Sequence, residues 1–324
     1  LGPHKLPLIG RADWNDCLRL GANGESSFVA FQLYLAMSIQ KELAAEKQDT
    51  AAVDKLIGQQ EAFGQLVQKL CWNEDRFIRG FTEAGETIGK RTDPEANLWL
   101  NPQSWAVISG LASKEQADTI LNTVHEGLNT DYGAMLMQPP YHAHAFDGAL
   151  AVIYNAGVKE NAGIFSQSQG WLVLAEALLG HGNRAFEYYK ENSPAEQNDR
   201  AEIRKLEPYC YGQFTEGKDS PHFGRSHVHW LTGTASTMMV GTVEGILGVR
   251  PDLHGLRLAP SIPAEWDGFT MEKTFRGHKL HITVRNPDHK ETGCTNLTLN
   301  GAMLPSNYIP AEQLMAENKI VLTM

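Results

Sequence analysis

The stretch FVAFQLYLAMSIQKEL, residues 28–43, has the apolar spacing of one helix face. Its large apolar side chains recur at steps of three and four residues, which matches the turn of an α-helix and not the alternation of a strand. The residues of this stripe are Phe28, Phe31, Leu35, Ile39 and Leu43. A polar break follows at Asp49 and Thr50, and residues 53–70 then repeat the pattern. Two such stripes joined by a short break predict a hairpin of two helices.

Further helices are expected along most of residues 22–250. Asn101-Pro102 is typical of a helix start, because an Asx cap is followed by Pro at the first helical position. The other helical segments pass through Ile120, Val124 and Leu128 and over residues 168–180, 183–192 and 228–247. Long loops rich in Gly, Pro and aromatic residues separate them, at 131–165 and 205–227. Paired helices joined in this way predict that residues 1–250 are mainly α and form part of an α/α barrel with a site at one mouth.

The pattern changes to a period of two after Arg250-Pro251. FTMEKTFR and KLHITVRNP flank a tight turn at Gly277-His278, which predicts a β-hairpin. TNLTL precedes a second turn signal at Asn300-Gly301, and KIVLTM is expected to be a closing strand. These strands predict a small antiparallel β domain over residues 251–324.

The composition excludes several kinds of partner. The 324 residues carry a formal net charge of −10, which disfavours nucleic acid and anionic membranes. No stretch approaches the roughly 20 apolar residues that a membrane span requires. The four cysteines, Cys17, Cys71, Cys210 and Cys294, are scattered without a CxxC pair, which is typical of reduced, mostly buried thiols in a cytoplasmic protein.

The N-terminal residues LGPHKLPLIGRADWND lack a charged region followed by an apolar one, so they do not predict a signal peptide. They also lack an initiator Met, and an unusual motif follows almost at once. We therefore expect the sequence to be the C-terminal portion of a longer protein.

That motif is GRADWND, in which Asp13 and Asp16 flank Trp14 and Asn15. Cleavage of an acetal needs a proton on the leaving oxygen, and a carboxyl group beside an aromatic ring can have its pKa raised for this task. The Trp14 face is suited to stacking on a sugar ring. The alternative is a turn with Asx caps, in which Asp13 caps a helix and Asp16 is solvated.

Three further clusters crowd polar groups between predicted helices. Residues 159–171, KENAGIFSQSQGW, offer the donors and acceptors that a polyol needs, and the alternative is an ordinary helix cap. Residues 206–213, LEPYCYGQ, place an acid and an amide in an aromatic run, with a packed loop as the alternative. Residues 230–236, WLTGTAS, enter a helix through small hydroxyl residues, which favours an anion such as phosphate but lacks a Walker pattern.

Two histidine pairs, His142 with His144 and His227 with His229, invite a metal site. Neither has the i, i+4 spacing or the matching Cys and His set that zinc requires. GxSxG and GxGxxG are absent, which argues against serine hydrolase and dinucleotide chemistry. We predict no metal and no cofactor.

Seven short segments, distributed over nearly the whole chain, occur in the same order in one known family of enzymes. They are GRADWND, NPQSWAVISG, GVKENAGIFSQSQGW, LEPYCYGQ, WLTGTAS, GILGVRPDLHGLRLAPSIPAEWDGF and FRGHKLHI. Together they resemble the inverting cellobiose and chitobiose phosphorylases, glycoside hydrolase family ninety-four. HFGRSHVHWLTGTAST is most similar to the chitobiose branch. The resemblance implies an (α/α)6-type catalytic barrel, of which residues 1–250 would form part, and a small β domain after it.

The resemblance also implies roles for single residues. Asp16 corresponds to the catalytic acid. Substrate-binding groups correspond to Trp14, Lys159, Glu160 and Gln213, with Lys159 at the acceptor sugar, and phosphate-binding groups correspond to Gln167, Thr232 and Gly233. Cellobiose phosphorylases place a His where Gln167 stands, which argues against a plain cellobiose phosphorylase.

The implied reaction uses inorganic phosphate as a substrate and needs no cofactor. Phosphate would convert a β-linked disaccharide, N,N'-diacetylchitobiose, to α-GlcNAc 1-phosphate and GlcNAc. The alternatives are phosphorolysis of cellobiose or another β-glucoside, an inverting hydrolase with Glu160 as base, and a sugar-binding module without catalysis. The family further implies a homodimer.

Overall fold

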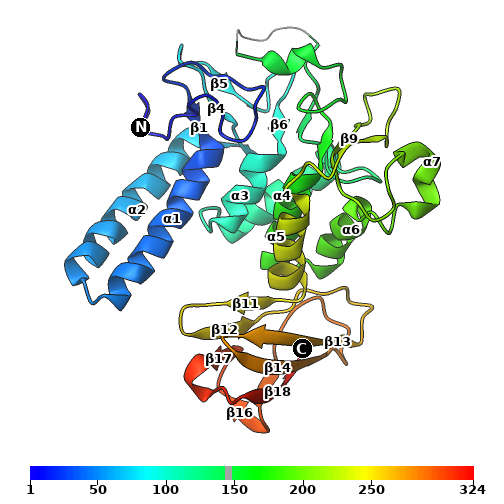
Figure 1. Ribbon diagram of the computed structural model, residues 1–324. Coiled ribbons are helices and arrows are strands. Elements are labelled where there is room, and N and C mark those ends of the chain that lie inside the picture. The colour runs from blue at the N-terminus through cyan, green and yellow to red at the C-terminus, as the bar shows by residue number, and fades with distance from the viewer. Residues whose placement is uncertain (143–147) are drawn as a thin grey trace. The chain divides into compact units, whose positions relative to one another are not determined.

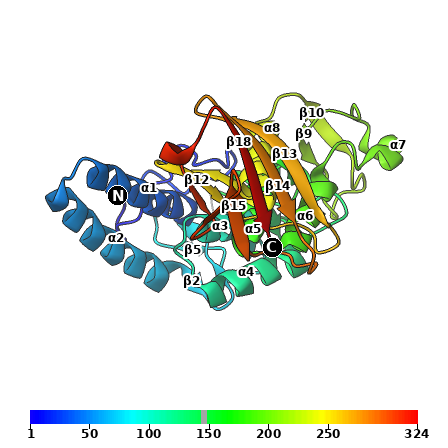
Figure 2. The same ribbon diagram turned by 90° about the horizontal axis from the view of Figure 1, so that it is seen from below.

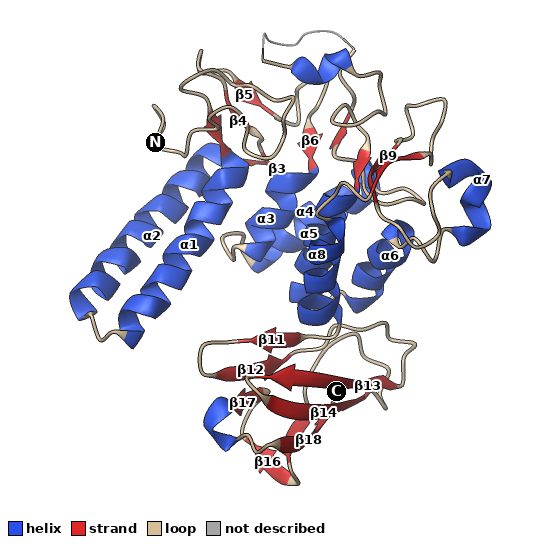
Figure 3. Ribbon diagram, viewed as in Figure 1, coloured by secondary structure: helices blue, strands red, loops and turns tan. Residues whose placement is uncertain are grey.

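The computed structural model describes residues 1–142 and 148–324. The chain divides into two compact units, unit 1 with Leu1–Ser168 and Glu191–Thr232, and unit 2 with Gln169–Lys190 and Gly233–Met324. Helices α5 (Ser166–Leu178) and α6 (Gly182–Asn192) each run from one unit into the other. The described residues contain helices mainly in the first part and β-sheets at the C-terminal end, which confirms the predicted order of element types (Figure 3). The predicted boundary between residues 250 and 251 stays a prediction.

The remaining elements of unit 1 are helices and short strands. The helices are α1 (Ser27–Glu46), α2 (Thr50–Cys71), α3 (Leu100–Ile108), α4 (Lys114–Leu128) and α7 (Ala201–Arg204), with 3-10 turns at Leu150–Ile153 and Asn198–Arg200. The strands are β1 (Glu25–Ser26), β2 (Trp72–Asn73), β3 (Arg76–Phe77), β4 (Gly80–Phe81), β5 (Thr87–Ile88), β6 (Leu98–Trp99), β7 (Met137–Gln138), β8 (Ile164–Phe165), β9 (Gly212–Thr215) and β10 (Ser226–His229). The long predicted loops 131–165 and 205–227 therefore contain short paired strands.

Helices α1 and α2 form the predicted hairpin and lie side by side (Figures 1 and 2). Ser26 caps α1 by accepting from the Val29 N–H at 3.2 Å, and Asp49 caps α2 by accepting from the Ala52 N–H at 3.0 Å. The start of α1 is anchored by Phe31, whose ring meets Phe77 edge-on at 5.1 Å between centroids. Burial of these aromatic rings fixes the N-terminal end of α1, which directly follows the strand that carries Ser26.

Helix α3 does not begin as predicted. It starts at Leu100 with Trp99 as the capping residue, so Asn101 and Pro102 already lie inside its first turn. Trp99 makes no side-chain cap bond, and the Leu100 N–H instead donates to the Leu136 carbonyl at 3.0 Å. The pairing of β6 with β7 brings residue 136 to the N-terminal start of α3, so tertiary structure replaces the local cap.

Two three-stranded sheets of unit 1 hold segments that are distant in sequence. Strands β1, β4 and β5 form one antiparallel sheet, and β8, β9 and β10 form another with β9 in the centre. In the second sheet Phe165 is directly opposite Phe214, and Phe214 is opposite His227. The sheet therefore joins two of the predicted polar clusters.

Unit 2 contains helices packed through small residues. The predicted helix 228–247 is shorter than expected, because residues 226–229 form β10 and α8 spans only Thr234–Val240 before a π-helical turn at Gly241–Ile246. Gly170 of α5 lies against Thr237 of α8, where an added Cβ would stand 2.4 Å from the Thr237 carbonyl carbon. This close approach leaves no room for a side chain.

We expect Gly170→Ala to lower the free energy of unfolding by about 1–3 kcal/mol, as overpacking does when backbone must move. Gly58→Ala in α2 is the matched control, because no atom lies within 4 Å of a Cβ at Gly58. There the higher helix propensity of Ala is expected to raise stability by up to about 1 kcal/mol. Urea unfolding followed by circular dichroism measures both, and equal stability of the two variants would contradict the packing argument.

The C-terminal part of unit 2 is built from two sheets. The strands are β11 (Val249–Pro251), β12 (Gly255–Leu258), β13 (Gly268–Phe275), β14 (His278–Arg285), β15 (Asn296–Leu299), β16 (Ala302–Leu304), β17 (Tyr308–Pro310) and β18 (Glu317–Thr323), with a 3-10 turn at Ala311–Gln313. The sheet orders are β11-β12-β17 and β13-β14-β18-β15-β16. Leu280, Ile282 and Val284 are buried on one face of β14 and alternate with more exposed residues, as the period of two predicts.

The predicted antiparallel domain is in fact mixed. Strand β14 pairs with β18 in parallel, with Ile282 opposite Ile320, while the other pairs of this sheet are antiparallel. A parallel pair requires a long return connection, and here the β15–β16 hairpin and β17 supply it. In residues 1–142 and 148–324, none of the helices combines the length and apolarity that crossing a membrane requires.

Candidate active site

Asp13 is the buried anchor of the GRADWND loop. Its Oδ1 accepts from the Trp14 and Asn15 backbone N–H groups at 2.6 and 3.1 Å. Its Oδ2 accepts from the Ser26 hydroxyl at 2.6 Å and lies 2.7 Å from Nη2 of Arg79, and both charged side chains are fully buried. Burial alone raises the pKa of Asp13, but the Arg79 charge and the donated hydrogen bonds outweigh it and hold the pKa below its usual value. Asp13 is thus an ionised structural group that caps a turn.

Arg79 connects this loop to the helical core. Its Nη1 donates to Ser26 Oγ at 3.2 Å and its Nη2 donates to Asn15 Oδ1 at 2.9 Å. Its guanidinium also lies 5.5 Å from the Trp99 ring centroid. Arg79 is not among the site residues predicted from the sequence. Its charge within the otherwise apolar run FIRGF, residues 77–81, is the sequence signal that could have identified it.

Asp16 is exposed, whereas Glu160 is buried. Oε2 of Glu160 accepts from the Cys17 backbone N–H at 2.9 Å and from Asn15 Nδ2 at 3.5 Å. Burial raises the pKa of Glu160, and the negative charge of Asp16 raises it further, although the hydrogen bond from Cys17 opposes the shift. Glu160 therefore holds the backbone on which Asp16 stands, and the two carboxyl groups interact.

The raised pKa of Glu160 predicts a specific pH dependence. An acid with a higher pKa in the folded state binds more protons when folded, so it makes the free energy of unfolding fall as pH rises from the unfolded pKa through the folded pKa. We expect Glu160→Gln to remove this fall while still accepting from the Cys17 N–H. Urea unfolding of both proteins between about pH 4 and 8 measures the difference. Parallel stability curves would contradict the burial of a titrating Glu160.

Trp14 packs in an aromatic cluster with Phe165 and Phe214. Its ring meets Phe165 edge-on at 5.1 Å, and its Nε1 donates to Gln167 Oε1 at 3.1 Å. Phe165 in turn faces Phe214 across the β8–β9 pair. Gln213 precedes Phe214 on β9 and is half-buried. Successive side chains of a strand point to opposite faces of its sheet, so Gln213 lies on the face opposite to Phe214.

Lys159 occupies a strained turn beside Glu160. Its backbone has a φ of +50°, and its Nζ lies 5.4 Å from the Tyr154 ring centroid. Gly163 closes the turn by donating to the Lys159 carbonyl at 2.9 Å, and a Cβ at Gly163 would stand 2.4 Å from that oxygen. The turn thus fixes the backbone of Lys159 and of the adjacent, buried Glu160.

Hydrogen bonds and charge interactions join Trp14, Asp16, Lys159, Glu160 and Gln167 in one part of unit 1. The predicted phosphate-binding residues Thr232 and Gly233 lie where the chain passes from one unit to the other. Thr232 ends unit 1, and Gly233 begins the last segment of unit 2. The Thr232 N–H donates to the Trp230 carbonyl at 3.1 Å, and Gly233 is the capping residue of α8. Their role in binding phosphate stays a prediction.

The histidine pairs are engaged in other contacts. His227 Nε2 lies 2.6 Å from Glu216 Oε1, and His229 Nδ1 lies 2.7 Å from Glu207 Oε2. His142 pairs with Glu95 at 3.3 Å, and His144 lies outside the described residues. Within residues 1–142 and 148–324, no group of three or more His, Cys, Asp or Glu side chains is arranged to hold a metal ion.

The chain is similar to known proteins over nearly its whole length. The catalytic domain of the glycosyl hydrolase 94 superfamily matches residues 1–248, and the chain belongs to this family. The C-terminal domain of glycosyl hydrolase family 65 matches residues 249–296.

Individual relatives carry phosphorylase names. An N,N'-diacetylchitobiose phosphorylase from Vibrio furnissii is 37% identical over 97% of this chain and 39% of its own length. A solabiose phosphorylase from Paenibacillus borealis is 30% identical over 96% of this chain and 41% of its own length. The chain thus spans about two fifths of these relatives. A solved structure titled sialidase superposes with a TM-score of 0.62 at 14% identity, covering 95% of this chain and 29% of that one, which indicates a shared fold alone.

Proposed function

We propose that this chain carries the general acid of an inverting β-disaccharide phosphorylase. The observation that carries the proposal is the contrast among three neighbouring carboxyl groups. Asp13 forms a buried ion pair with Arg79, and Glu160 accepts a hydrogen bond from the Cys17 backbone N–H. Asp16, two residues after Trp14, is exposed. Asp16 is therefore the carboxyl of this loop that is available to a substrate.

In the proposed reaction the Asp16 carboxyl donates its proton to the glycosidic oxygen. Phosphate attacks the anomeric carbon from the opposite face, the carbon–oxygen bond to the acceptor breaks, and an α-sugar 1-phosphate and a free sugar leave. Trp14, Glu160 and Gln213 would bind the cleaved sugar, and Lys159 would bind the acceptor. Gln167, Thr232 and Gly233 would bind phosphate.

Glu160 is better suited to positioning than to activating water. An inverting hydrolase separates its two carboxyl groups by about 6.5–9.5 Å to admit a water molecule. Here Oε2 of Glu160 accepts from the N–H of Cys17, the residue that follows Asp16, and this bond suits Glu160 to positioning the Asp16 backbone. A phosphorylase needs no second carboxylate, because phosphate is already an anionic nucleophile. This arrangement favours phosphorolysis over hydrolysis.

N,N'-diacetylchitobiose is the substrate we propose, on the strength of the 37% identity to the phosphorylase of that name. Gln167 is consistent with this choice, since cellobiose phosphorylases resemble the chain here but carry His. The proposal includes an (α/α)6 barrel of which this chain supplies part, a homodimer and a cytoplasmic location. Cellobiose and other β-glucosides remain the alternative substrates.

The deciding experiment incubates the whole protein that contains this chain with a panel of β-linked disaccharides, with and without inorganic phosphate. Phosphate-dependent release of an α-sugar 1-phosphate supports the proposal, and the disaccharide with the highest kcat/KM identifies the substrate. Cleavage at the same rate without phosphate identifies a hydrolase. Sugar binding without any cleavage identifies a non-catalytic binding module.

A further inference from the structure

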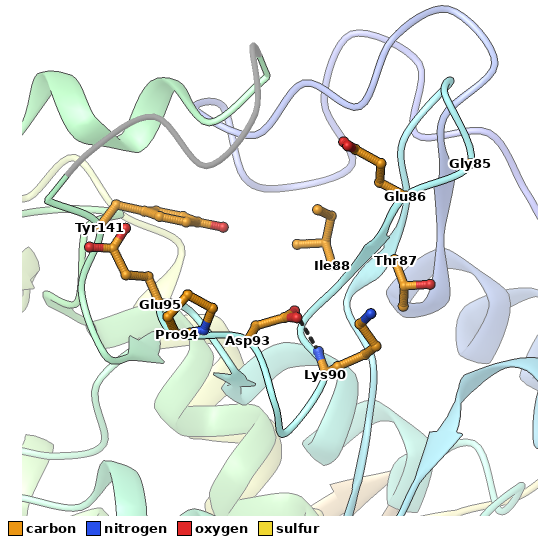
Figure 4. A pocket seen from close by; sticks show the side chains of 9 residues that line it. All are labelled: Gly85, Glu86, Thr87, Ile88, Lys90, Asp93, Pro94, Glu95 and Tyr141. Carbon is orange, nitrogen blue, oxygen red and sulfur yellow. Dashed lines mark hydrogen bonds between the residues drawn. The ribbon is translucent and has the colours of Figure 1, made fainter.

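A cavity of about 570 Å³ lies in unit 1 and takes no part in the reaction described above. It opens beside the β4–β5 turn, with Tyr141 on the opposite wall (Figure 4). Its volume falls within the range of roughly 300–1,000 Å³ that small-molecule sites occupy. Ile88 forms an apolar part of the wall, and charged groups line the rest.

Tyr141 is buried, with 3% of its surface exposed, yet its hydroxyl points into the cavity (Figure 4). The backbone of Tyr141 is fixed on both sides by Asn161, which accepts from the Tyr141 N–H at 2.7 Å and donates to its carbonyl at 2.8 Å. Among the described residues the hydroxyl has no hydrogen-bond partner. Burial, together with the charges of Asp93 and Glu95, raises the pKa of Tyr141, so the hydroxyl stays a neutral donor. A buried polar group aimed at an open cavity needs a partner from a ligand or from water.

The other polar groups of the cavity are partly pre-organised. Oδ2 of Asp93 accepts from the backbone N–H groups of Gly89 and Lys90 at 2.9 and 2.8 Å. Oε1 of Glu95 accepts from the His142 N–H at 3.0 Å. These bonds hold the two carboxylates in place while each keeps its second oxygen for a ligand. The side chains of Glu86 and Lys90 form no hydrogen bond or ion pair within the described residues.

The charges decide which ligand fits. Three carboxylates, from Glu86, Asp93 and Glu95, face a single Lys90 ammonium, so the cavity repels phosphate and other anions. The described residues offer no metal-binding group here or elsewhere. Carboxylate oxygens with one ammonium, one phenol and an apolar patch instead match a neutral ligand with many hydroxyl groups.

We propose that this cavity binds a pyranose ring as a sugar subsite separate from the reacting centre. The sugar hydroxyls donate to Glu86 and Asp93, one oxygen accepts from the Tyr141 hydroxyl or the Lys90 ammonium, and the ring rests on Ile88. The choice of a sugar, rather than another polyol, rests on the proposed function. Asn161 connects the subsite to the reacting centre, because it follows Glu160 directly and fixes the Tyr141 backbone.

Sugar binding tests this inference without requiring turnover. The whole protein is labelled with 3-fluorotyrosine, and the Tyr141 fluorine signal is assigned as the one lost in Tyr141→Phe. Titration with GlcNAc, glucose and N,N'-diacetylchitobiose is expected to shift this signal at millimolar concentrations. Calorimetry is expected to show sugar binding weakened about three- to tenfold in Tyr141→Phe and in Glu86→Gln, the range for one lost hydrogen bond. Tyr209→Phe is the matched control, since Tyr209 is 71% exposed and outside the cavity.

Glucose 1-phosphate provides a charge control and is expected to bind the subsite more weakly than glucose. A Tyr141 signal that does not move in any neutral sugar overturns the inference, as does equal sugar affinity in Tyr141→Phe and Tyr209→Phe. The two proposals fail in different ways. Tyr141-dependent sugar binding without phosphorolysis would sink only the proposed function, whereas normal phosphorolysis with an unresponsive Tyr141 would sink only the subsite.

Discussion

Asp16→Asn is expected to slow phosphorolysis by about 10²–10⁴-fold, the usual contribution of a positioned proton donor. The amide keeps the size of the side chain but cannot deliver a proton to the glycosidic oxygen. Since Asp16 is exposed, folding should be unaffected. Initial rates of sugar 1-phosphate release measure the loss, and calorimetry measures disaccharide binding, which should be retained.

Asp54→Asn is the control for this change, because Asp54 is an exposed residue of α2 in a segment remote in sequence from the site. It should leave the rate unchanged. Turnover of Asp16→Asn at the rate of the parent protein would mean that another group supplies the proton, and the assignment of the acid would be wrong.

Arg79→Met is expected to lower the free energy of unfolding by about 3–5 kcal/mol, because it leaves the buried Asp13 carboxylate without its partner. Asn15 and Ser26 lose the same donor, so the loop that carries Asp16 should loosen as well. Urea unfolding gives the stability. Arg91→Met is the control, since Arg91 is 52% exposed, and the loss of its surface ion pairs is expected to change stability by no more than about 1 kcal/mol.

The buried ion pair of Asp13 with Arg79 also predicts a loss of stability in acid. The pKa of Asp13 is lower in the folded state than in the unfolded chain, so its contribution is present above the unfolded pKa and is lost as pH falls through the folded pKa. Arg79→Met should flatten this acid limb. A double variant, Asp13→Asn with Arg79→Met, should recover part of the stability, because no unpaired charge remains. Equal losses for Arg79→Met and Arg91→Met would contradict the buried ion pair.

Local patterns predicted the elements that depend on local spacing. The stripe from Phe28 to Leu43 predicted α1, and the alternation around Gly277 predicted the β13–β14 hairpin. The start of α3 was wrong because the Leu100 N–H is satisfied by Leu136, a partner that no local signal reveals. The parallel pairing of β14 with β18 was missed for the same reason, since strand spacing does not encode the direction of a distant partner.

The sequence by itself determined the helical hairpin, the β-rich end, the family and the candidate carboxyl groups, because each depends on residue types at short spacing. It left open whether GRADWND is a catalytic motif or a turn with Asx caps, in which Asp13 is the cap and Asp16 is solvated. Tertiary structure decided the surroundings of the two aspartates, because it brings Arg79 from 66 residues away onto Asp13 and Glu160 from 143 residues away onto the Cys17 N–H. Two aspartates in one loop differ chemically only through their surroundings, and burial with a charged partner exists only in the folded chain.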